Sequence, residues 1–567
     1  MRKLACTVPL ALTAALFVVS APAGCGVPSA DGPADSFGLD LSMPADANVT
    51  GAVVFLVDGL NAKIFQEMFE AGELPAIKKY FAERGLYAPR AAANIPSVTF
   101  ANLTSITTGV FPGHHGITGI NHFDRNRLIW RDYTTIAQKN TPDGDHTSAT
   151  IYEQFPDRTT FSVFFQPHRG ATKFMENALS AAPPYGFGWY EFVDRLTLSR
   201  LKLVAEVARK RKEWPAVTMV YLLAPDFQAY GHGVGAEKYR EALKHTDRQI
   251  GRVLGDFEKA GLLDKLIIAL ASDHSMCSVK SHVHLERLLR RMFLDIATRH
   301  LWEETPFEQR LDYYQGYSCV CYGSGDRYTA ICLRKPIRNS EGKFVGFEPW
   351  LVRPSADDLK AYPALQLARA LRSNPVNGVS DLLEVDPTVD LPKTLVELEG
   401  VDAVAYAVGP NVVRVRRRGG EVEFRQEGGR GALITYGVVF GGDPLGWAGK
   451  VPDEAMGGKP FSGRDWLKMT VGTDYPDLPE QIVAYFRAPR AGDIAVFAAE
   501  GWDFDEVRKG GHGGLRSIDM HVPILLAGPG VPKGRVDAAR TVDLMPTLLK
   551  LMGRPIPGNL DGQPLVP

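Results

Sequence analysis

The sequence predicts an α/β fold with a mostly parallel central sheet, flanked by helices, and a β-rich insertion late in the chain. Residues 51–57 form a continuous apolar, β-branched run, which is typical of a strand buried on both faces. Helical spacing follows over residues 64–81 and again over 238–257, so strands and helices alternate. Further apolar runs of strand length lie at residues 160–165, 217–223, 266–271 and 523–527.

The chain divides into five expected segments. We interpret residues 51–304 as the first part of the core and residues 480–567 as the second part. Between them, residues 305–479 break into short, alternating, glycine-rich segments, which indicate an inserted β-rich cap. We expect residues 1–25 to be a lipoprotein-type signal peptide and residues 26–50, which have few large apolar groups, to be a flexible tether. The expected cap strands are residues 328–333, 403–408, 411–415 and 432–440.

The N-terminus carries a targeting signal. Arg2 and Lys3 precede an apolar stretch over residues 8–21, which is too short to span a bilayer permanently. The small residues 23–24 then stand before Cys25, and this ending resembles a bacterial lipoprotein signal in which the cysteine is lipidated. An ordinary secretory signal is the alternative. We therefore expect export to the cell envelope or periplasm, with a lipid anchor on Cys25 as the contact with the membrane.

The net charge bears on possible nucleic-acid binding, and the number of cysteines bears on possible disulfide bonds. With 64 basic and 65 acidic residues the net charge is −1, so we expect no nucleic acid polymer as a partner. No other run is long and apolar enough for a transmembrane helix. Outside the signal and Cys25, four cysteines remain, and three disulfide pairings are open to them. They are Cys277, Cys319, Cys321 and Cys332.

Polar residues that can bind a metal ion follow several expected strands. Asp58 follows residues 51–57, Asp226 follows 217–223, and the pair Asp273 and His274 follows 266–271; His512 lies in a glycine-rich loop. In open α/β sheets ligands bind beyond the carboxyl ends of the strands, so these side chains are expected to meet. Carboxylate oxygen and imidazole nitrogen are suitable zinc ligands. Singly, an aspartate at such a position more often caps a turn.

A threonine stands where a helix is expected to begin. Pro96 and Ser97 mark the start, so Thr99 would lie in the first turn, where unpaired amides and the helix dipole favour an anion. The alternative is that Thr99 only caps the helix. Asn102 follows three residues later on the same segment.

Taken together, these motifs resemble the alkaline phosphatase superfamily, and most closely its type I phosphodiesterase and nucleotide pyrophosphatase branch. The matching segments are Asp58 at a strand end, Thr-Phe-x-Asn at residues 99–102, Ser-Asp-His-x-Met at residues 272–276, and Gly-His-Gly around His512. The resemblance implies that the protein binds two divalent metal ions, and zinc is the ion that we expect. Asp58, Thr99, Asp273 and His274 would hold one ion, and Asp226, His512 and a further histidine the other.

The resemblance also implies a reaction. Thr99 would attack phosphorus in line, giving a phosphothreonine that water then hydrolyses, and Asn102 would donate to a non-bridging oxygen. The substrate would be a small phosphate ester, cleaved by a phosphodiesterase or nucleotide pyrophosphatase. One alternative is a phosphomonoesterase, for which Arg169 is a candidate clamp on the additional phosphate charge. Another is a catalytically weak envelope lipoprotein that binds phosphate compounds.

One position departs from the family pattern. The family places a metal-binding histidine four residues after the aspartate matched by Asp226, and here that position is Tyr230. His232 comes two residues later, between Gly231 and Gly233. Because glycines open turns that other residues cannot adopt, we expect the loop to shift and His232 to bind the second ion. The alternative is a second ion held weakly or not at all.

Overall fold

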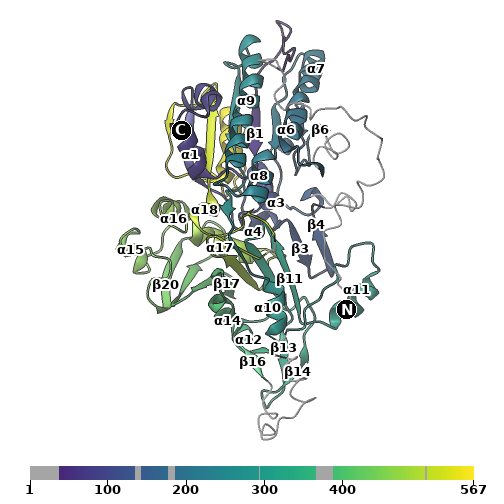
Figure 1. Ribbon diagram of the computed structural model, residues 1–567, viewed down its shortest axis with the longest axis vertical. Coiled ribbons are helices and arrows are strands. Elements are labelled where there is room, and N and C mark those ends of the chain that lie inside the picture. The colour runs from purple at the N-terminus through teal and green to yellow at the C-terminus, as the bar shows by residue number, and fades with distance from the viewer. Residues whose placement is uncertain (1–36, 135–141, 176–185, 293, 365–386, 505–506) are drawn as a thin grey trace.

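A computed structural model describes residues 37–134, 142–175, 186–292, 294–364, 387–504 and 507–567. Two large sheets follow one another along the long axis of the molecule (Figure 1). The expected signal and Cys25 lie outside the described residues. No helix in the described part of the chain has both the length and the apolar character needed to cross a bilayer.

Eight strands form the central sheet, in the order β25-β2-β24-β8-β1-β7-β5-β6. The five strands from β8 to β6 are parallel, whereas β24 is antiparallel to both of its neighbours. The prediction of a mostly parallel sheet is therefore confirmed. The strands are β1 (Gly51–Val57), β2 (Leu86–Ala92), β5 (Thr160–Val163), β6 (Lys173–Met175), β7 (Val217–Leu222), β8 (Leu266–Ala271), β24 (His521–Ala527) and β25 (Gly534–Arg535).

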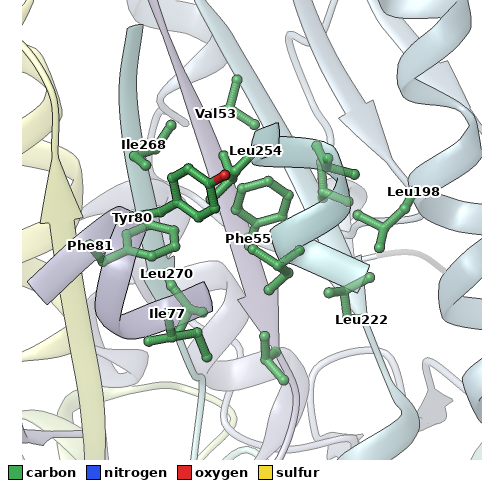
Figure 2. Close-up of a cluster of buried hydrophobic side chains, with 14 of the residues drawn as sticks. Val53, Phe55, Ile77, Tyr80, Phe81, Leu198, Leu222, Leu254, Ile268 and Leu270 are labelled. Atoms are coloured by element: carbon green, nitrogen blue, oxygen red, sulfur yellow. The ribbon is translucent and has the colours of Figure 1, made fainter. Parts of the chain in front are cut away.

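Both faces of this sheet are covered by helices, which explains the uninterrupted apolar run of β1. Figure 2 shows Val53 and Phe55 of β1 on one face, among Tyr80 and Leu254. The alternate residue Val54 belongs to the buried cluster on the other face. Each such fully buried side chain contributes roughly 1.5–3 kcal/mol to stability. The helices are α1 (Ala62–Glu70), α2 (Pro75–Ile77), α6 (Tyr190–Ser199), α7 (Leu201–Arg211), α8 (Ala224–His232) and α9 (Glu237–Lys259) around the first cluster, with α3 (Thr99–Thr108) and α19 (Leu544–Leu551) at the second.

The second sheet has seven strands, in the order β11-β12-β21-β17-β18-β19-β20, and every neighbouring pair is antiparallel. Six of its seven strands, all except β21, lie where the sequence predicts the β-rich cap, residues 305–479. Buried residues of α17 pack on one face and those of α14 on the other. The elements are β11 (Cys319–Ser324), β12 (Tyr328–Leu333), β17 (Val401–Gly409), β18 (Val412–Arg417), β19 (Gly420–Gln426), β20 (Ile434–Gly441), β21 (Ile494–Ala498), α14 (Leu391–Glu397) and α17 (Leu478–Arg487).

Two segments differ from the expected organisation. Strand β21 lies beyond residue 479 yet pairs with β12 and β17, so the sheet of the cap extends into the segment assigned to the core. The described part of the expected tether, residues 37–50, packs against the core: Leu41 is buried, and the amide of Leu39 donates to Asp256 at 3.2 Å. The few apolar side chains of this segment suffice because a preformed apolar surface receives them.

The cysteines and the remaining, mostly short, helices and strands complete the description of the fold. Cys319 and Cys321 lie on β11, and all four cysteines of the described part are free thiols. The remaining strands are β3 (Asn121–Asp124), β4 (Ile129–Asp132), β9 (Cys277–Ser278), β10 (Ser281–His282), β13 (Pro336–Arg338), β14 (Phe344–Phe347), β15 (Tyr362–Pro363), β16 (Thr388–Val389), β22 (Trp502–Asp503) and β23 (Gly510–Gly511). The remaining helices are α4 (Pro112–His115), α10 (Leu285–Arg291), α11 (Phe307–Gln315), α12 (Ala356–Lys360), α15 (Asp453–Met456), α16 (Gly463–Thr470) and α18 (Ser517–Met520), with single turns at Lys78–Ala82, Pro142–Gly144, Tyr152–Gln154 and Thr541–Asp543.

Candidate metal centre

Three carboxylates meet at the carboxyl ends of adjacent parallel strands. Asp58 directly follows β1, Asp273 follows β8, and Asp226 lies in the first turn of α8, just after β7. Because β8, β1 and β7 are neighbours in the sheet, the side chains converge, as the sequence predicts. They are 2%, 1% and 3% exposed, respectively.

Two imidazoles complete the cluster. His274 follows Asp273, while His512 arrives from the loop after β23, which pairs with β9. Their rings stack, with centroids 3.5 Å apart and an interplanar angle of 11°. The loop approaches α8 so closely that a Cβ at Gly510 would lie 2.4 Å from the carbonyl oxygen of Ala229. A glycine is therefore required there for His512 to reach the site.

The ligand atoms form two overlapping groups that suit divalent cations. Asp58, Asp273 and His274 offer atoms within 4.8 Å of one another, and so do Asp226, His274 and His512. Within the described residues, Oδ1 of Asp58, Oδ1 of Asp226 and Oδ2 of Asp273 are buried and accept no hydrogen bond. Buried carboxylates without partners are costly unless a cation neutralises them. The donor set therefore fits metal binding.

The pKa values of the three aspartates are raised, which shows that the structure does little to stabilise their negative charge. Burial raises the pKa of Asp58 well above its ordinary value, and the neighbouring charge of Asp273 adds to the effect. Burial also raises the pKa of Asp273 to about 7, with Asp226 contributing. For Asp226, burial and then the charge of Asp58 raise the pKa well above its usual range. A bound cation would hold all three groups ionised at neutral pH.

Backbone carbonyls orient both imidazoles. Nδ1 of His274 lies 3.1 Å from the carbonyl oxygen of Ser275, and Nδ1 of His512 lies 2.9 Å from that of Ser97. A carbonyl only accepts, so we assign the proton of each neutral ring to Nδ1. The Nε2 lone pairs then point into the site, which is the arrangement metal-binding histidines require.

Thr99 is the first residue of α3, and its hydroxyl faces this cluster. Oγ1 of Thr99 lies 3.0 Å from Nε2 of His274. The N-cap residue of the helix is Val98, and no side chain caps the helix start. The interpretation of Thr99 as a mere helix cap is therefore wrong. The hydroxyl lies beside the candidate ligands and at the positive end of a ten-residue helix.

Asn102 has a different role from the one that the resemblance implies. Its side-chain amide donates to the carbonyl oxygens of Pro96 at 2.9 Å, Val98 at 3.1 Å and Asn94 at 3.3 Å. Its Oδ1 accepts from the backbone and side-chain amides of Asn94 at 2.6 and 2.9 Å. The residue is fully buried, so the expected donation to a substrate oxygen is wrong for this arrangement. Asn102 instead fastens the loop that precedes Thr99.

The prediction for His232 is also wrong in this structure. Helix α8 continues through residue 232, and residues four apart share one helix face, so Tyr230 lies on the same face as Asp226. His232 is six residues from Asp226, roughly 240° around the helix, and is exposed to solvent. The hydroxyl of Tyr230 lies 2.7 Å from Nε2 of His512. Because the segment is helical, it makes no loop that could carry His232 inward.

Some residues near the site are ones that the sequence did not single out. Tyr221, at the end of β7, donates its hydroxyl to Oδ2 of Asp58. Arg508 stacks on Tyr230, and Asp326 comes from the turn between β11 and β12. No local spacing could reveal these contacts, because they join separate elements. Arg169, the candidate phosphate clamp, instead donates to the carbonyl oxygens of His146 and Ser148 and pairs with Glu153.

Comparisons with known proteins agree with this geometry. Residues 52–316 match the family model described as type I phosphodiesterase / nucleotide pyrophosphatase. Mouse ectonucleotide pyrophosphatase/phosphodiesterase family member 1 is 26% identical over 251 residues, covering 43% of this chain and 26% of the mouse protein. An uncharacterized pyrophosphatase/phosphodiesterase of Schizosaccharomyces pombe is 24% identical over 230 residues, covering 40% and 44%. The chain thus spans about a quarter of the first of these relatives.

The fold comparison covers more of the chain. The structure of murine ectonucleotide pyrophosphatase/phosphodiesterase 5 aligns with 90% of this chain and 97% of its own, at a TM-score of 0.51 and 13% identity. The α/β sheet with carboxylates and imidazoles at its carboxyl edge is consistent with an alkaline phosphatase-like core. Residues 52–316 of this chain are thus similar to the type I phosphodiesterase / nucleotide pyrophosphatase family.

Proposed function

We propose that this protein hydrolyses phosphate esters as a phosphodiesterase or nucleotide pyrophosphatase, with Thr99 as the nucleophile and two divalent cations, zinc, as cofactors. One observation carries the proposal: the hydroxyl of Thr99 faces His274, beside three buried carboxylates that each have one oxygen without a hydrogen-bond partner in the described part of the chain. A threonine that served only the fold would have no reason to lie beside uncompensated charge.

In this proposal, different residues hold each of the two cations, and Thr99 attacks phosphorus. Asp58, Asp273 and His274 would hold one cation beside Thr99, and Asp226 and His512 would hold the other. When bound, these cations favour loss of the hydroxyl proton and stabilise negative charge on the reacting oxygens. Thr99 Oγ1 then attacks phosphorus as the bond to the leaving oxygen breaks, and water later hydrolyses the phosphothreonine.

The start of α3 would hold the phosphoryl group. The first amides of a helix lack partners within the helix, and the helix dipole makes this end positive. A phosphate oxygen bound there would lie beside Thr99. Asn102 supports this site indirectly, since it ties together the carbonyls of the preceding loop. Tyr221 holds Asp58 in its orientation.

A comparison of two substrates tests the proposal. The protein is stripped of metal, reloaded with zinc, and assayed on bis(p-nitrophenyl) phosphate and p-nitrophenyl phosphate. We expect no turnover without metal, recovery with zinc, and the higher kcat/KM on the diester. Full turnover by the metal-free protein would refute the mechanism. A higher kcat/KM on the monoester would instead make the protein a phosphomonoesterase.

We also propose that the protein is exported and anchored to the envelope through lipid on Cys25. The support is the sequence of residues 1–25, with its basic start, apolar stretch and small residues before the cysteine. Replacing Cys25 with Ser should abolish labelling by a fatty-acid analogue and release the protein from the membrane fraction. Unchanged membrane fractionation of that variant would reject the anchor.

A further inference from the structure

Arg508 lies over the ring of Tyr230, next to the candidate metal centre. It belongs to the segment between β22 and β23, and the next residue ties that segment to α8: the amide of Lys509 donates to the carbonyl oxygen of Tyr230 at 2.9 Å. The carbonyl oxygen of Lys509 in turn accepts from the amide of Val279 at 2.7 Å. The backbone beside Arg508 is therefore held between α8, which carries Asp226 and Tyr230, and the residue that follows β9.

The guanidinium is oriented by two contacts. Its Cζ lies 4.2 Å from the centroid of the Tyr230 ring, and its Nε lies 3.3 Å from Oδ2 of Asp326. The hydroxyl of the same tyrosine reaches Nε2 of His512, so Arg508 lies over the phenol ring whose hydroxyl meets His512. A stacked and paired guanidinium loses little further entropy when it binds an anion.

The positive charge of Arg508 affects Asp226 and His512, two of the candidate metal ligands. It lowers the pKa of Asp226, against the increase caused by burial and by Asp58. It also lowers the pKa of His512, in the same direction as burial. Its side chain is 43% exposed. It thus combines closeness to the ligands with access from solvent.

In-line attack by Thr99 places the leaving oxygen on the opposite side of phosphorus, towards Asp226 and His512. A group attached to that oxygen and directed past Tyr230 would meet Arg508. We propose that Arg508 is a specificity-determining residue that binds negative charge on the leaving group, so that an anionic leaving group such as pyrophosphate is favoured over an uncharged alcohol. This inference rests on the proposed phosphate-ester hydrolysis.

Two substrates that transfer the same group test the inference. A nucleoside 5′-monophosphate p-nitrophenyl ester releases a leaving group without an additional charge, whereas the matching nucleoside triphosphate releases pyrophosphate. Arg508→Gln should lower kcat/KM for the triphosphate about tenfold or more and change that for the nitrophenyl ester less than about twofold. Arg508→Lys should recover part of the loss. An equal loss on both substrates, or no loss on either, would overturn the proposal.

A matched control and a binding measurement separate recognition from a structural role. Arg535→Gln removes an exposed arginine that pairs with Asp537 on the edge strand β25 and should leave both substrates unaffected. In zinc-loaded Thr99→Ala protein, calorimetry should show about tenfold weaker binding of inorganic pyrophosphate after Arg508→Gln, at unchanged metal content. Unchanged pyrophosphate affinity would also overturn the proposal. If the unaltered protein cleaves neither substrate, the proposed function fails, while this binding result still tests Arg508.

Discussion

The phenol oxygen of Tyr230 lies 2.7 Å from Nε2 of His512, in the position where the family pattern places an imidazole. Tyr230 shares a helix face with Asp226, so all three side chains surround the same volume. A phenol becomes a strong ligand only when ionised, and its unperturbed pKa is about 10. Burial raises the pKa of Tyr230 further, chiefly by excluding water from the phenolate. The proposed second metal ion would therefore have one strong ligand fewer than in the family pattern.

Replacing Tyr230 with His should strengthen the second metal site. A neutral imidazole binds zinc without ionising, so we expect the affinity for the second ion to rise about tenfold or more. Metal content and affinity are measured by mass spectrometry and competition with a chromophoric chelator. His232→Ala is the matched control and should keep both ions, because His232 is exposed on another helix face. Loss of an ion from that control would restore His232 as a ligand.

Removal of the Thr99 hydroxyl should abolish turnover without unfolding the protein. Thr99→Ala should reduce kcat by roughly 10³-fold or more, and Thr99→Ser should retain part of the activity because it keeps an attacking oxygen. Thr104→Ala removes a hydroxyl from the same helix that donates only to a backbone carbonyl, and should remain active. Near-normal turnover by Thr99→Ala would show that another group is the nucleophile.

Asn102→Ala should cost stability as well as activity. The change leaves carbonyl oxygens of the preceding loop and the amide of Asn94 without their partner, at a cost of about 3 kcal/mol. Urea denaturation measures the free energy of unfolding, and steady-state kinetics measure the activity. A large loss of kcat with unchanged stability would instead support direct donation from Asn102 to the substrate.

His122 should make the protein less stable in mild acid. Neither ring nitrogen has a hydrogen-bond partner among the described residues, and burial, aided by Arg490, lowers the pKa of His122 to about 3. The unfolded chain, with a pKa near 6.5, binds the proton first as the pH falls. The contribution of His122 to stability is therefore complete above about pH 6.5 and is lost towards pH 3, by about 2 kcal/mol at pH 5.

The variant His122→Phe should remove this part of the pH dependence. Phenylalanine keeps a ring against Tyr133, whose centroid lies 5.8 Å away, but it cannot bind a proton. Urea denaturation of both proteins at pH 7 and pH 5 gives the comparison, in which other titrating groups cancel. An identical decrease in both proteins would show that His122 is neutral in the unfolded state as well, or charged in the folded one.

Local patterns in the sequence predict the central sheet and the metal ligands for one physical reason. A parallel strand covered on both faces, such as β1, must be apolar throughout, and the polar residue after it must lie at the sheet edge. Asp58, Asp273 and His274 follow directly from that rule. The seven-stranded sheet was predicted as a β-rich cap, since its strands alternate between glycine-rich turns.

The errors arise where distant contacts decide the outcome. The glycines beside His232 suggest a loop, but contacts with α9 and β23 accompany a helix that extends through this residue. The residues that pair with β21 are 163–169 positions away in β12 and 88–97 positions away in β17, so local spacing could not assign it to a sheet. The role of Asn102 depends on carbonyls that turn towards it only in the folded loop.

The turn between β11 and β12 joins the seven-stranded sheet to the loop that carries His512. The amide of His512 donates to the carbonyl oxygen of Gly325 at 2.7 Å, and the amide of Arg327 donates to that of His512 at 3.0 Å. Swinging the seven-stranded sheet outwards as a hinged lid would break both bonds and move His512, a candidate metal ligand. We therefore expect substrate to reach the proposed site without such a movement of the sheet.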